Sequence, residues 1–154
     1  MIQVNFYSFK ELSKEAQYKA ISTNFEKLYD ICSYFDNIDM SKSIQKFCDM
    51  LDIQFDSNYN LYFYDVDDIS IEDLKDIKDC DITGVYTDTY ITDIIQRWVQ
   101  DSESIKDMFS NIAQSCNNFF DKIASTEYIA ECLLNDFENI YFTEDGKLIY
   151  INHE

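Results

Sequence analysis

The chain has 154 residues, of which 46% are hydrophobic and 16% aromatic, so it carries enough apolar side chains for a folded core and is not intrinsically disordered. Its 30 acidic residues against 12 Lys and Arg give a formal net charge of -18. Because this charge repels phosphate backbones and anionic lipid surfaces, it excludes direct binding to nucleic acid and to membranes.

The N-terminal third predicts two amphipathic helices. In residues 8–35 apolar side chains recur at helical spacing after one of two N-caps, either Ser8 with Glu11 in a capping box or Ser13. The inward positions of this first long helix are Leu12, Ala16, Ala20, Ile21, Leu28, Ile31 and Phe35. A second helix is predicted over residues 40–52, with Ile44, Phe47, Cys48 and Leu51 on its apolar face.

The middle of the chain predicts strands and a short helix. Residues 59–66 are rich in aromatic and branched side chains, which is typical of a strand, and residues 82–87 predict another. Between them, Ser70 and Asp73 have the spacing of a helix N-cap.

The C-terminal third predicts three helices and a hairpin. One helix covers residues 89–100 with Trp98 in the core, and two more begin at the N-caps Ser102 and Ser125. Asp145 and Gly146 predict a two-residue hairpin turn. We therefore predict one acidic α+β domain over residues 1–154, in which several amphipathic helices pack on a small, mainly antiparallel sheet with a C-terminal β-hairpin.

Five cysteines are widely spaced, without a C-x-x-C pair, and four fall on apolar helix faces. We expect them to be reduced and buried, as in a cytoplasmic protein. The first residues contain neither a basic segment nor a long apolar run, so we expect no secretion signal and no membrane span.

The residue inventory argues against an enzyme. The only histidine, His153, is next to the last residue, so a Ser or Cys nucleophile has no base. With 2 glycines, no phosphate-binding loop can form. We expect no catalytic residue, no cofactor and no dedicated metal site.

The acidic run over residues 65–81 holds eight acids and two lysines. Three interpretations compete: a solvated surface that maintains solubility, an oxygen-ligand site for Mg²⁺ or Ca²⁺, which the spacing does not favour, and a surface that imitates nucleic-acid phosphates. Exposed tyrosines beside acids are also typical of protein-binding surfaces. The candidate partner-binding residues are Asp65, Asp67, Asp68, Glu72, Asp73, Asp76, Asp79, Asp81, Asp88, Tyr62 and Tyr64.

Two segments, together about a quarter of the chain, resemble a family of small phage and prophage proteins. Residues 7–20, YSFKELSKEAQYKA, resemble the family pattern Y-x-F-x-E-L-S-x-E-A-x-x-K-A, and residues 125–149 resemble its capped helix followed by an F-T-E-D-G-K-L-I hairpin. Residues 55–84 depart from the family, whose relatives carry a Gly- and aromatic-rich stretch there.

The resemblance implies a mobile-element protein that acts inside a bacterial cell, where such proteins are frequently inhibitors of host defence, including anti-CRISPR proteins. With the acidic run, this predicts an inhibitor that blocks the basic channel of a host nucleic-acid-handling protein, such as a CRISPR effector. The alternative is a non-enzymatic regulatory or structural interaction module of a prophage, as a monomer or a homodimer.

Overall fold

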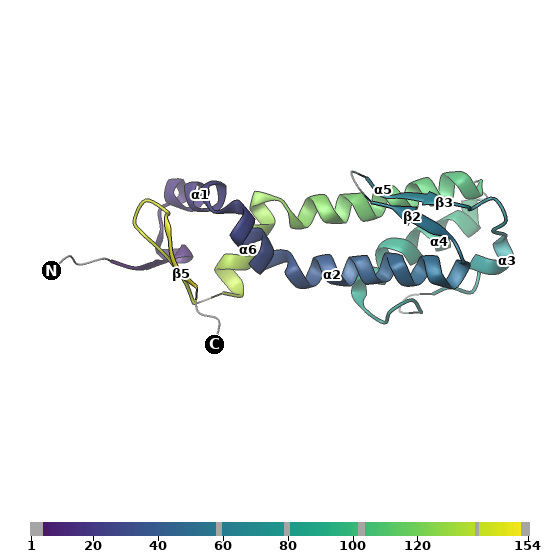
Figure 1. Cartoon of the computed structure of the whole chain (residues 1–154), viewed down its shortest axis with the longest axis horizontal. Helices are drawn as coiled ribbons and strands as arrows, with labels where there is room; N and C mark the ends of the chain where they lie inside the picture. Colours follow the sequence, from purple (N-terminus) through teal and green to yellow (C-terminus); the bar gives the residue numbers. More distant parts are fainter. Residues whose placement is uncertain (1–4, 58–59, 79–80, 102–103, 138, 152–154) are drawn as a thin grey trace. The chain divides into compact units, whose positions relative to one another are not determined.

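The computed structural model describes residues 5–57, 60–78, 81–101, 104–137 and 139–151. In chain order the elements are β1 (Tyr7–Ser8), the 3-10 turn η1 (Phe9–Glu11), α1 (Lys14–Thr23), α2 (Phe25–Leu51), β2 (Gln54–Asp56), β3 (Tyr62–Tyr64), α3 (Ile71–Leu74), the 3-10 turn η2 (Tyr86–Asp88), α4 (Thr89–Asp101), α5 (Ile105–Ile123), α6 (Thr126–Asn135), β4 (Ile140–Phe142) and β5 (Leu148–Ile151) (Figure 1). The predicted α+β class is confirmed.

The chain divides into two compact units, one formed by residues 1–35 and 122–154 and the other by residues 36–121. Each unit has its own β-sheet: the first has three strands in the order β1-β4-β5, the second pairs β2 with β3, and every pairing is antiparallel. The single domain expected over residues 1–154 stays a prediction.

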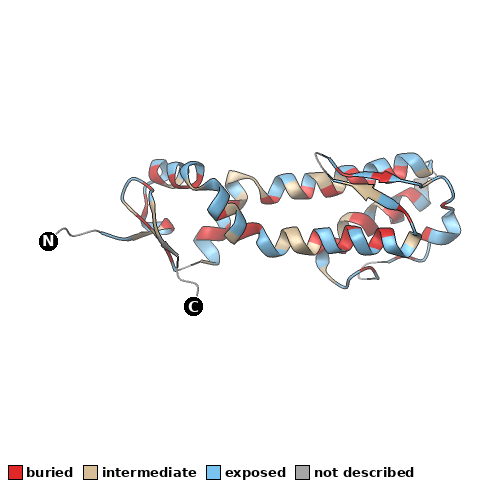
Figure 2. Cartoon of the chain, viewed as in Figure 1, coloured by how far each residue is buried: buried red, intermediate tan, exposed pale blue. Residues whose placement is uncertain are grey.

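In the first unit α1, α6 and the first turns of α2 share one core with the sheet. Its largest buried side chains include Phe9, Ile21, Leu28, Ile129, Leu133 and Phe142. Figure 2 colours the ribbon by burial and shows buried positions along the helices. The predicted N-caps Ser13 and Ser125 are confirmed, because their hydroxyls accept hydrogen bonds from the backbone N–H groups of Ala16 and Tyr128. The Ser8 and Glu11 box also forms, but around η1.

The predicted helix boundaries near the N-terminus are wrong. The helix expected over residues 8–35 breaks at Asn24, whose side-chain amide donates to the Ala20 carbonyl at 2.8 Å and so caps the end of α1. In contrast, α2 runs without interruption into the segment expected as a separate helix, because no Gly or Pro stands between them to end it. Phe35, expected in the core, is 75% exposed.

The C-terminal hairpin is confirmed, but its turn is not the expected two-residue one. The Thr143 N–H donates to the Lys147 carbonyl at 2.8 Å, and the Gly146 N–H donates to the Thr143 carbonyl at 2.9 Å, so three residues form the loop. Asp145 keeps an ordinary φ, and only Gly146 enters the left-handed region, at φ 88°. This is the arrangement of a type I turn closed by a glycine.

The second unit packs α4, α5 and the second half of α2 around an aromatic cluster. The Phe63 ring centroid lies 5.5 Å from that of Phe109 on α5 and 6.1 Å from that of Phe47 on α2. Trp98 is buried, as predicted. The strand expected over residues 59–66 is present as β3, with Tyr59 outside the described residues.

Of two further predictions for the second unit, the helix cap at Ser70 is confirmed and the strand over residues 82–87 is wrong. The Ser70 cap is confirmed, because Asp73 accepts from the Ser70 N–H at 2.9 Å. The strand expected over residues 82–87 is wrong, because this segment forms bends that lead into η2. Ser102 lies outside the described residues, and the Ser104 hydroxyl accepts from the Asp107 N–H at the start of α5.

Four cysteines, Cys32, Cys48, Cys116 and Cys132, are buried thiols, as predicted, whereas Cys80 lies outside the described residues. Burial raises the pKa of Cys48 and of Cys116 to about 12, so neither thiol ionises near neutral pH. Contact with the Cys132 thiol, together with burial, raises the pKa of Cys32. None of the helices in the described part of the chain has the length and hydropathy needed to cross a bilayer.

Candidate functional site

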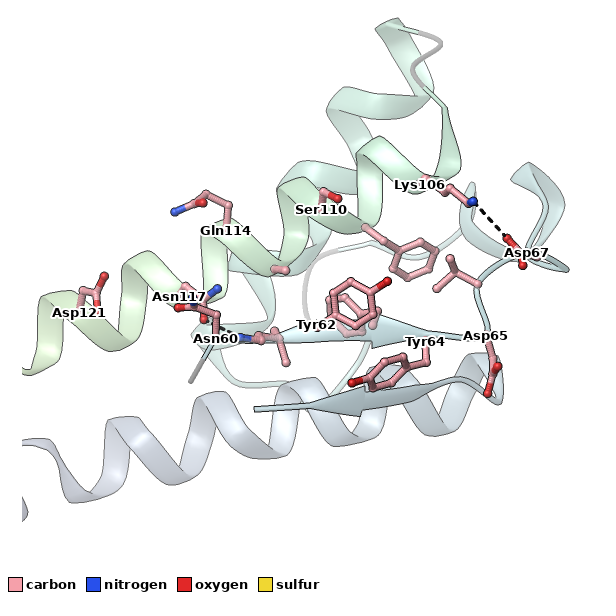
Figure 3. A pocket seen from close by; sticks show the side chains of 15 residues that line it. Asn60, Tyr62, Tyr64, Asp65, Asp67, Lys106, Ser110, Gln114, Asn117 and Asp121 are labelled. Carbon is pink, nitrogen blue, oxygen red and sulfur yellow. Dashed lines mark hydrogen bonds and ion pairs between the residues drawn. The ribbon is translucent and has the colours of Figure 1, made fainter. Parts of the chain in front are cut away.

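A groove of about 580 Å³ lies between β3 and α5 in the second unit (Figure 3). We call it the Tyr–Asp groove; its lining consists of residues 60–67 together with Lys106, Phe109, Ser110, Ala113, Gln114, Asn117 and Asp121. Four of the predicted partner-binding residues are among them: Tyr62, Tyr64, Asp65 and Asp67.

Side chains alternate between the two faces of β3, and this alternation determines which of them are exposed in the groove. Because neighbouring residues of a strand face opposite sides, burial of Phe63 turns Tyr62 and Tyr64 toward solvent. Tyr62 is 60% exposed and Tyr64 42%, with ring centroids 4.7 Å apart in an edge-to-face arrangement. The Tyr64 hydroxyl donates to the Asp56 carboxylate at 3.2 Å. Desolvation, followed by the nearby Asp56 charge, raises the pKa of Tyr64.

A hydrogen bond links the segment before β3 to α5. The Leu61 N–H, one residue before β3, donates to the Asn117 side-chain oxygen at 3.0 Å. Gln114, one turn earlier on α5, donates its amide to Asn118 at 2.9 Å. The side-chain carbonyl of Gln114 makes no hydrogen bond to another described residue.

The charge of the groove is negative. Asp65, Asp67 and Asp121 are exposed acids in its lining, and Lys106 is the one cation there among the described residues. The Lys106 ammonium lies 3.9 Å from an Asp67 carboxylate oxygen, a distance at which two exposed groups attract only weakly. Asp65 adopts φ 60°, a left-handed conformation that Asp and Asn tolerate better than most residues.

Several of the other exposed acids in the predicted set make hydrogen bonds or ion pairs within the chain. Asp68 makes no hydrogen bond or ion pair to another described residue. The Glu72 carboxylate lies 2.6 Å from the Lys75 ammonium, which raises the pKa of Lys75, and the charge of Asp76 helps to raise it. Asp73 caps α3, as described above, and Asp81 accepts from the Lys78 N–H at 2.8 Å. Asp79 lies outside the described residues.

Asp88 is wrongly assigned to the partner-binding surface, because it is 0% exposed. Its carboxylate accepts hydrogen bonds from the Ser43 hydroxyl at 2.7 Å and the Thr83 hydroxyl at 2.6 Å. It also accepts from the backbone N–H groups of Thr83 and Gly84, at 2.8 and 2.9 Å. Desolvation raises the pKa of Asp88, but these hydrogen bonds outweigh it and the net shift is downward. Asp88 is therefore a structural anchor that ties residues 83–84 to α2.

Sequence reasoning missed the α5 side of the groove. Ser110, Gln114, Asn117 and Asp121 recur at helical spacing, and this polar stripe was the available signal. Any solvated helix carries such a stripe, so the sequence alone cannot tell which one faces a strand.

Comparisons with protein families, curated proteins and solved structures found no match. The chemistry of the site is therefore inferred from its own geometry. Among the residues that the structure describes, no group of three His, Cys, Asp or Glu side chains is placed to hold a metal ion. The groove presents two aromatic rings, several carboxylates and side-chain amides, which are groups that can contact cations and form hydrogen bonds.

Proposed function

We propose that the protein is a non-enzymatic binding module that holds a cationic segment of a partner protein in the Tyr–Asp groove. The observation that carries this proposal is that two exposed tyrosine rings and three exposed carboxylates line one groove, in which Lys106 is the one cation among the described residues. An arginine side chain can stack on an aromatic ring and bind a carboxylate through two N–H groups at once.

The charge of the whole chain supports the same proposal. A net charge of -18 attracts a basic partner over a distance and speeds its arrival. Asp68 and Asp76 are exposed acids of the same run, and they extend the negative surface beyond the groove. The solvated-surface interpretation accounts for these two acids but not for the tyrosine pair.

The resemblance to phage and prophage proteins guides the choice of partner. We propose a basic host protein that handles nucleic acid in the bacterial cytoplasm, namely a CRISPR effector nuclease or complex, whose channel the acidic surface blocks. DNA carries a charge about every 1.7 Å along its axis, so a few carboxylates replace only a short stretch of phosphates. That is enough to occlude a channel entrance.

The test measures how strongly guide-loaded CRISPR effectors bind a labelled target duplex, with and without the protein. We expect inhibition at about 50 mM salt that weakens at about 300 mM, because ions screen exposed charges. The variant Asp65→Asn/Asp67→Asn/Asp121→Asn should lose inhibition. A matched variant, Asp30→Asn/Glu131→Gln/Glu144→Gln, removes three exposed charges from the other unit and should keep it. Equal loss in both variants would contradict the assignment to the groove.

A second candidate, the self-associating interaction module, is favoured by one observation on α2. Tyr34 and Phe35 are 56% and 75% exposed, and their ring centroids lie 5.3 Å apart. Exposed aromatic pairs are typical of contact surfaces between proteins. Light scattering on wild type and Phe35→Ser separates the candidates: a dimer that Phe35→Ser dissociates supports this module, and a monomeric wild type contradicts it.

A further inference from the structure

The outer edge of β3 faces the Tyr–Asp groove with unused backbone hydrogen-bonding groups. In an antiparallel ladder, the backbone groups of successive residues point alternately toward and away from the partner strand. The Leu61 N–H points away from β2, since it donates to Asn117 on α5. Phe63, two residues later, must point its N–H and C=O the same way.

Phe63 is the middle residue of the β2–β3 ladder, opposite Phe55. Its outward N–H and C=O make no hydrogen bond to another described residue, and Phe63 lines the groove. A backbone edge left open in this way is a template for another strand.

We propose that the cationic partner segment binds in extended form, as a third strand on the outer edge of β3. This inference rests on the proposed function and adds the conformation of the ligand. Main-chain hydrogen bonds to Phe63 supply the register, and side chains at alternate positions supply the specificity.

The two faces of the added strand differ in their surroundings. One face lies with Tyr62 and Tyr64, which are exposed, and near Asp65 and Asp67, so it takes Arg or Lys. The other face lies with Phe63 and Phe109, which are buried, so it takes an apolar side chain. The fitting segment is an extended one in which basic and apolar residues alternate. A cationic helix does not fit, because it cannot pair with a strand edge.

The first experiment uses short synthetic peptides in which Arg and Val alternate, measured by fluorescence anisotropy. Two versions carry backbone N-methyl groups, either on every Arg or on every Val, and thus keep the same charge. A third probe is oligoarginine. Because alternate N–H groups face β3, we expect one methylated version to lose at least about tenfold in affinity and the other to bind like the unmodified peptide. A shift by one residue cannot rescue binding, since it exchanges the two faces.

The second experiment follows amide hydrogen exchange by NMR. In the free protein the Phe63 amide should exchange faster than those of Tyr62 and Tyr64, and the unmodified peptide should slow it by at least about tenfold. A Phe63 amide that is already protected, or that the bound peptide leaves unchanged, overturns the inference.

The outcomes separate the two proposals. If all peptides, oligoarginine included, bind equally and with strong salt dependence, the groove recognises charge alone: the strand inference fails and the proposed function stands. If no basic peptide binds and the effector assay shows no inhibition, the proposed function fails as well.

Discussion

Gly146 in the C-terminal turn lies so close to Ala16 on α1 that a Cβ at position 146 would come within 2.6 Å of the Ala16 carbonyl oxygen. The same Cβ would lie 2.9 Å from the Ala20 backbone nitrogen. Asn24, which ends α1, donates its side-chain amide to the Gly146 carbonyl at 3.2 Å. Residues far apart in the chain therefore meet at this contact, and small residues on both sides allow it.

We expect Gly146→Ala to destabilise the protein more than Gly84→Ala. Both glycines have left-handed φ values, 88° and 86°, but the added Cβ meets backbone only at Gly146 and nothing within 4 Å at Gly84. Strained φ costs about 1 kcal/mol at either position, and the clash adds about 2 kcal/mol at Gly146. Urea unfolding of both variants measures the difference. Equal losses would show that α1 moves away without penalty.

We expect Asp88→Asn to lower the free energy of unfolding by about 2–4 kcal/mol, because an amide cannot accept all the hydrogen bonds that the buried carboxylate accepts. An NH₂ group would face donors from Ser43, Thr83 and Gly84. The control is Asp93→Asn on the exposed side of α4, which should change stability by no more than about 0.5 kcal/mol. A similar small effect at both positions would contradict the anchoring role.

The pKa of Asp88 predicts how stability depends on pH. Since the folded state holds this pKa below its ordinary value of 3.8, the carboxylate stabilises the fold above about pH 4, and this contribution disappears as the pH falls through the folded pKa. The stability gap between wild type and Asp88→Asn should therefore be constant near neutral pH and shrink in acid. Urea titrations of both proteins at several pH values test this. A gap that widens in acid would mean that the pKa is raised.

We expect Ser110→Trp to block the Tyr–Asp groove without unfolding the protein. Ser110 is exposed on α5 and lines the groove, so an indole there occupies the space beside β3. Binding of the alternating Arg-Val peptide and inhibition of the effector should both fall by at least about tenfold. Gln96→Trp, at an exposed α4 position outside the groove lining, should leave both unchanged. If both variants bind the peptide normally, the ligand site lies elsewhere.

Most helices could be predicted from local pattern, whereas their ends and the packing of exposed positions could not. Ser13, Ser70 and Ser125 act as caps because capping needs only residues a few positions apart. The pattern does not predict that the two helices fuse into α2, because Asp36, Asn37 and Asp39 interrupt the apolar pattern without interrupting the helix. Residues 82–87 by themselves predict a strand, because nothing in their own sequence reveals that Asp88 accepts hydrogen bonds from the backbone of Thr83 and Gly84.

The candidate site likewise has features that the sequence predicts and features that only the tertiary structure reveals. The sequence by itself determined the composition of the surface: a strand with three consecutive aromatic residues, followed by acids whose charge the few lysines cannot balance. Only the tertiary structure decided which of these residues share a groove, because contact of Phe63 with Phe47 and Phe109 orients β3 against α5 and thereby turns Tyr62 and Tyr64 outward. The tertiary structure also buries Asp88, which the sequence analysis assigns to the surface. The charge of a surface follows from the sequence alone, but burial depends on packing between residues far apart in the chain.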